Sequence, residues 1–155
     1  MSLRGKGAVA IWHDIAPEGL AEFHAWHGNE HMPERVGIPG FLRGRRYEAI
    51  DAELGFFNLY ETVDAGVLTG DAYRARLNAP TPWTVATVKH FRNVARSLCA
   101  VAWTHAKADG GSIATFVPKG DVAPELLSRL AQAPGIAGVH ALVADEAASG
   151  EINAE

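Results

Sequence analysis

Apolar residues gather in short runs, separated by glycine and proline, over the first two thirds of the chain, a pattern typical of alternating strands and helices. The run at residues 7–15 is rich in strand-forming residues, and Pro17 follows it as a favourable first-turn residue of a helix. Over residues 20–27 the apolar and imidazole side chains recur at every third or fourth position, which places them on one helical face. Gly28 either ends or weakens this helix, and Pro33 can begin a further turn.

A turn and two strands follow. Residues 37–40, Gly-Ile-Pro-Gly, form the turn, and the β-rich runs at residues 41–50 and 56–63 flank a polar segment at residues 51–55. Two such runs with a short polar connection predict a β-hairpin.

The next segments predict helices and a fourth strand. Residues 68–77 favour a helix, residues 80–82 (Pro-Thr-Pro) interrupt it, and residues 83–91 favour a second helical stretch. Residues 94–105, rich in Val, Ala, Leu and Trp, predict a strand. The order β-α-β-β-α-β predicts an α+β fold with a four-stranded antiparallel sheet and both helical layers on one face.

The rest of the chain repeats the opening. Three features recur in the same order before a second strand: the apolar runs at 7–13 and 111–117, Ala-Pro-Glu at 16–18 and 123–125, and the glycine-bracketed turns at 37–41 and 135–139. An amphipathic stretch lies between the second and third features in both copies. These matches favour an internal duplication.

The second copy stops early. Residues 1–106 hold a complete unit, whereas residues 107–155 hold only a β-α-β part of a second unit. Since an incomplete sheet exposes an edge, we expect a barrel built from the two units of one chain, with a homodimer as the alternative.

The element order, the aromatic-rich first strand and the segment at residues 26–35, Trp-His-Gly-Asn-Glu-His-Met-Pro-Glu-Arg, resemble the dimeric α+β barrel superfamily, in particular its EthD-like and related uncharacterised members. In that superfamily two ferredoxin-like units, from two chains or one, pack sheet to sheet, and a small-molecule cavity lies between each sheet and its helices. The resemblance implies a ferredoxin-like unit at residues 1–106. Members include heme-free monooxygenases, isomerases and cyclases, so the resemblance selects no single reaction.

Three histidines on the first predicted helix are the main chemical signal. His24, His27 and His31 share the face that looks at the sheet, where a buried imidazole needs a hydrogen-bonding partner. The equivalent stretch of the second copy, residues 126–132, has no histidine. The fold therefore does not require these rings, and we expect them to be catalytic, with His27 the strongest candidate.

Imidazole titrates near neutral pH, which suits acid–base chemistry or the polarisation of a substrate oxygen. Three histidines and a carboxylate would also suit zinc or non-heme iron, but the spacing lacks the His-Glu-x-x-His order of a metalloprotease helix. We therefore predict acid–base use with no metal and no cofactor.

Further residues are candidates for substrate binding. Strand alternation sends Arg43 and Arg45 to one face and Arg46 to the other, where Arg46 can bind an anionic oxygen. Tyr60 and Trp83 are candidates for a cavity lining. The other candidates are Trp26, in the segment that carries the resemblance, and Glu30, placed to orient a ring nitrogen.

The composition limits the classes of molecule that the chain is expected to bind. Fourteen basic against eighteen acidic residues give a net charge of -4, without the basic excess that nucleic-acid binding requires. No apolar run is long enough to span a membrane or serve as a signal peptide, and the single cysteine forms no internal disulfide. We expect a cytoplasmic, small-molecule enzyme that acts on an apolar carbonyl or aromatic compound. The alternative is a non-catalytic ligand-binding or assembly domain.

Overall fold

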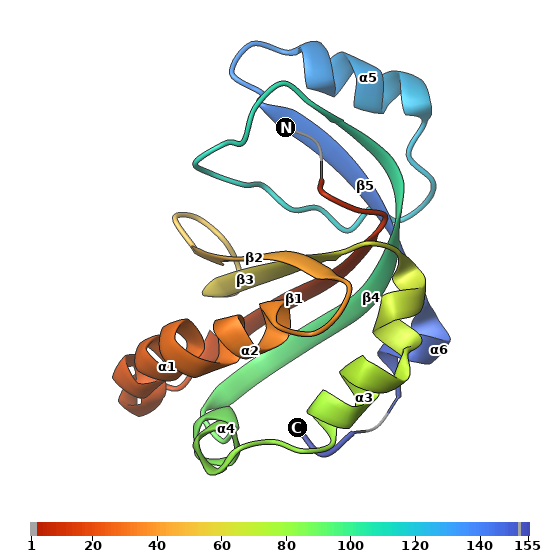
Figure 1. Ribbon diagram of the computed structural model, residues 1–155. Helices are drawn as coiled ribbons and strands as arrows, with labels where there is room; N and C mark the ends of the chain where they lie inside the picture. Colours follow the sequence, from red (N-terminus) through yellow and green to blue (C-terminus); the bar gives the residue numbers. More distant parts are fainter. Residues whose placement is uncertain (1–2, 152) are drawn as a thin grey trace.

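Five runs of β-forming residues pair into one antiparallel sheet in the computed structural model, which describes residues 3–151 and 153–155 (Figure 1). The strands are β1 (Gly7–Ile15), β2 (Phe41–Glu48), β3 (Phe56–Thr62), β4 (Phe91–Ala106) and β5 (Gly138–Ala144). Their order across the sheet is β2-β3-β1-β4-β5, and the chain has an α+β fold.

Helices connect these strands. The helices are α1 (Leu20–Trp26), α2 (Met32–Val36), α3 (Asp71–Leu77), α4 (Pro82–Val88), α5 (Pro124–Gln132) and α6 (Glu146–Ser149), with short helical turns η1 (Pro17–Gly19), η2 (His27–His31) and η3 (Ala65–Thr69). The predicted strand at residues 7–15 and the predicted hairpin are confirmed. The fourth strand begins earlier than predicted, at Phe91, because α4 ends at Val88 and the Phe91 ring packs on Phe23 and His13. Within the described part of the chain, no helix has the length and apolar character needed to span a membrane.

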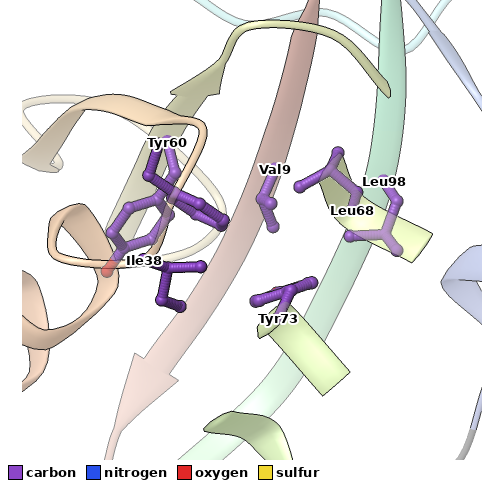
Figure 2. Packing of buried hydrophobic residues seen from close by; sticks show 7 residues of the cluster. Val9, Ile38, Tyr60, Leu68, Tyr73 and Leu98 are labelled. Carbon is purple, nitrogen blue, oxygen red and sulfur yellow. The ribbon is translucent and has the colours of Figure 1, made fainter. Parts of the chain in front are cut away.

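Strand alternation gives the sheet two different faces. On the face covered by α1 to α4, Val9 pairs with Tyr60 of β3 and Leu98 of β4 and packs with Ile38 and Tyr73 (Figure 2). The Tyr60 ring belongs to this apolar cluster, while its oxygen points away from Val9 and toward the α1–α2 region (Figure 2).

The opposite face is also buried. Ala8, Ala10 and Leu59 pack there with Leu3 and Cys99. Part of its cover comes from the connection between β4 and α5, since the indole of Trp12 donates to Oγ1 of Thr115 over 2.9 Å.

The strand predicted at residues 111–117 does not form. These residues are irregular and exposed, with 85% of Phe116 and 83% of Val117 accessible to solvent. The segment of this region that pairs with β4 is β5, along Cys99–Ala106, and residues 111–117 instead belong to the irregular connection between β4 and α5. The predicted helix and second strand of this region do form, as α5 and β5, and β5 extends the first sheet instead of beginning another.

Candidate functional site

The helix that carries the three histidines continues past Gly28 through one wide turn. In η2 the N–H of Met32 donates to the carbonyl of His27, an i to i−5 bond, and α2 follows directly. Pro33 has no N–H to offer the next carbonyl, which favours this local widening. The wide turn leaves both His27 and His31 buried, at 3% and 8% exposure.

His27 contacts the sheet through Tyr60. Its Nε2 lies 3.2 Å from Oη of Tyr60, and both side chains are buried. Burial, with the charge of Arg46 next in effect, lowers the pKa of His27 to about 3, and burial raises the pKa of Tyr60. Both groups are therefore neutral at physiological pH.

His31 lies one turn further along. Its ring packs on Trp26 with 4.3 Å between the ring centroids, and its Nδ1 is 3.5 Å from a carboxylate oxygen of Glu155. Burial, and then the charge of Arg35, lowers the pKa of His31 well below its ordinary value.

His24 differs from the other two rings. It is half-exposed, its Nε2 is 3.7 Å from a carboxylate oxygen of Glu48, and its ring lies near Phe56. His24 is therefore nearer to solvent than His27 and His31, and its catalytic role stays a prediction.

The structure adds two residues that the sequence analysis did not single out, His13 and Asn58. Asn58 Nδ2 donates to Nε2 of His13 over 2.8 Å, so the proton of this imidazole is on Nδ1, 3.2 Å from the carbonyl of Asp14. His13 is fully buried, and burial lowers its pKa. A signal for His13 was present, because β1 alternation places it on the same face as Val9 and Ile11. The same alternation places Asn58 on the face of Tyr60, two residues further along β3.

Arg46 reaches the same place from β2. It pairs across the strands with Asn58, and its guanidinium carbon lies 5.5 Å from the centre of the Phe23 ring. Its Nη1 and the Oδ1 of Asn58 are both buried and find no hydrogen-bond partner among the described residues. We call His13, His27, Arg46, Asn58 and Tyr60 the polar cluster.

Three predicted substrate-binding residues use their polar atoms at the contact of α1 and η2 with α4. The indole of Trp26 donates to Oγ1 of Thr84, and Glu30 accepts from the hydroxyls of Thr81 and Thr84. Trp83 donates to Glu22. These bonds give Trp26, Glu30 and Trp83 a structural use, and their part in ligand binding stays a prediction.

Two cavities lie away from the polar cluster. The larger, about 210 Å³, is lined by residues of η3, β4, β5 and α6, including Leu68, Cys99 and Val143. The smaller, about 10 Å³, lies between α3, β4 and Asn153. Neither is lined by a histidine of the described chain. In residues 3–151 and 153–155, no three His, Cys, Asp or Glu side chains are grouped so that they could hold a metal ion.

Comparison of the chain with protein-family models, with curated proteins and with solved structures finds no match.

Proposed function

We propose that this chain binds a small, mostly apolar carbonyl or aromatic compound against the helix-covered face of its sheet, and that the polar cluster acts on the oxygen of that compound without a cofactor. One observation carries the proposal: a buried donor, Arg46 Nη1, and a buried acceptor, Asn58 Oδ1, both lack partners. Buried polar groups without partners cost free energy, so two of them side by side favour a site where a bound molecule supplies the missing partners.

The electrostatics favour oxygen polarisation over proton abstraction. With a pKa of about 3, His27 is a weak base at pH 7, and the hydroxyl of Tyr60 keeps its proton. A neutral imidazole and a phenol can still share hydrogen bonds with a carbonyl or enol oxygen. The Arg46 guanidinium supplies the positive charge that stabilises a developing oxyanion.

The strand order supports assignment to the dimeric α+β barrel superfamily. Residues 7–106 place four strands in the order β2-β3-β1-β4, with α1 to α4 on one face (Figure 1). The opposite face, which packs against a second sheet in that superfamily, is covered here by the chain's own residues, such as Leu3 and Thr115. We therefore favour a face that the chain covers itself, with no second sheet among its described residues, over a homodimer formed through this face.

A second candidate is a non-catalytic ligand-binding domain. It is favoured by the partners that His13 and His27 already have within the protein, Asn58 and Tyr60. Under this proposal the polar cluster holds a metabolite that leaves unchanged.

The test is a panel of neutral compounds, acetophenone, cyclohexanone and phenol, titrated calorimetrically into the full chain, with mass spectrometry of each mixture for product. We expect His27→Gln and Arg46→Gln to weaken binding at least about tenfold. The matched control is His140→Gln, because His140 lies on β5 and bonds to Thr104. Product formation that the His27 variant loses supports the enzyme, and binding without product supports the second candidate. Equal binding by all variants contradicts both.

A further inference from the structure

Arg35, near the end of α2, is a buried guanidinium at 4% exposure with two carboxylate partners. Its Nη1 lies 2.8 Å from the carboxylate of its neighbour Glu34. Its Nη2 donates to the carboxylate of Glu155, which is 120 positions away in the sequence. A buried guanidinium needs a matched charge, and Glu155 is the partner that the tertiary structure brings to it.

Within residues 3–151 and 153–155, few contacts other than these ion pairs hold Glu155 in place. Residues 153–155 form no helix or strand, and their backbone bond to another part of the chain runs from Ala154 to Asn78, over 3.2 Å. The cavity of about 10 Å³ beside Asn153 has room for roughly one water molecule, so the packing of this segment is incomplete. The carboxylate of Glu155 is therefore held mainly by its own charge contacts.

His31 also lies beside the carboxylate of Glu155. Its Nδ1 is buried and without a hydrogen-bond partner in the part of the chain described, although it lies 3.5 Å from Oε1 of Glu155. If Nδ1 of His31 carries the proton, a ligand carboxylate placed slightly closer to His31 than that of Glu155 accepts hydrogen bonds from two groups. These are the imidazole of His31 and the guanidinium of Arg35. Glu155 thus satisfies Arg35 but leaves His31 unsatisfied.

The charge balance of this contact depends on Glu155. Arg35 and Arg76 share Glu34, and Glu155 is the second carboxylate bound by Arg35. Without Glu155, two guanidinium groups face one carboxylate, and Arg96, whose charge also acts on Glu155, adds a third positive group. When the carboxylate of Glu155 moves away, the excess positive charge of these guanidinium groups attracts another anion.

We propose that Arg35 and His31 form a carboxylate-binding end of the small-molecule site, and that Glu155 occupies it in place of the ligand's carboxylate until the ligand displaces it. The inference rests on the proposed function, because Tyr60 connects the two ends. Its hydroxyl lies 3.2 Å from His27, and its ring centre is 6.4 Å from that of His31. The substrate class is then a small aromatic or cyclic carboxylate.

Benzoate and benzamide test this assignment, because they share a shape and differ in charge. Both are titrated calorimetrically into the full chain at pH 7. We expect Glu155→Ala to tighten benzoate binding by about tenfold or more and to tighten benzamide binding much less. The variant opens the site to both compounds, but only benzoate carries the charge that replaces the lost carboxylate beside Arg35. The matched control is Glu151→Ala, which removes a carboxylate that pairs with the exposed Arg74 and leaves Glu155 in place.

The variant keeps Glu34 beside Arg35, and Glu155→Gln, of nearly the same shape, repeats the test if Glu155→Ala does not fold. The carboxylate assignment is overturned if benzoate binds equally well with and without Glu155, or if benzamide binding tightens as much as benzoate binding. In either case the result with the neutral compounds is unaffected. If the neutral compounds fail while benzoate still responds to Glu155, the proposed function falls, and with it the connection of this anion contact to His27.

Discussion

Three imidazoles, those of His13, His27 and His31, are buried beneath one helix and kept neutral by their surroundings. Burial is the main cause of the lowered pKa in each case. The charge of Arg46 adds to the lowering at His27 and that of Arg35 adds to it at His31, whereas Asp14 opposes the lowering at His13. The folded protein therefore resists protonation at positions where the unfolded chain accepts protons freely.

This difference predicts acid sensitivity. His27 has a pKa of about 3 in the fold against an ordinary value of 6.5, so its stabilising effect is complete above pH 6.5 and is lost as pH falls towards 3. The free energy of unfolding should fall by about 1.4 kcal/mol per pH unit through His27 in this window.

Urea denaturation from pH 7 to pH 4 measures this slope. His27→Gln should reduce the slope, whereas His140→Gln, on β5, should reduce it much less. An unchanged slope in the His27 variant would mean that the pKa of His27 is the same in the folded and the unfolded chain.

At the scale of elements, the helix α1–η2–α2 is tied to α4 by Glu30. Its carboxylate accepts from Thr81 and Thr84, and Thr84 also accepts from the buried Trp26. These bonds hold the histidine-bearing turn against the sheet.

We predict that Glu30→Ala lowers the free energy of unfolding by about 1 to 3 kcal/mol, because buried hydroxyls lose their acceptor. Thermal and urea denaturation measure the loss. The control is Glu18→Ala, at an exposed position of η1, which should change stability by less than about 0.5 kcal/mol. A Glu30 variant with full stability and lost binding of the panel compounds would restore Glu30 as a substrate-binding residue.

Strand alternation was sufficient to predict β1, the hairpin and the opposite directions of Arg45 and Arg46. The wide turn η2 was not predictable, because it depends on Pro33 together with packing on the sheet. The strand predicted at residues 111–117 was wrong because an apolar run does not show whether it pairs with a sheet, and here β5 is the segment that pairs with β4. The contact of Arg35 with Glu155 joins residues 120 positions apart, and no local pattern carries it.

At the scale of the whole molecule, the face of the sheet opposite α1 to α4 is held by charge as well as by apolar contact. Glu61 is fully buried and contacts Arg43, Arg45 and the backbone N–H of Arg4. Asp109, from the connection after β4, pairs with the same two arginines. This network joins the first and last thirds of the chain.

We predict that Glu61→Gln destabilises the chain by about 3 to 5 kcal/mol, because it leaves two arginines with less than their matched charge on a buried face. Asp109→Asn, at a position whose side chain is 40% exposed, should cost less than about 1 kcal/mol. Chemical denaturation of the two variants measures the difference. Equal small losses would show that this face is open to solvent.

The most direct test of the polar cluster as a ligand site is long-range ¹H–¹⁵N spectroscopy of the histidine rings at pH 7, with and without acetophenone, cyclohexanone or phenol. We expect a neutral His27 ring whose nitrogen signals shift when a compound binds, while the signals of His140 stay in place. A His27 ring protonated at pH 7, or a His27 signal that none of the three compounds moves, would contradict this expectation.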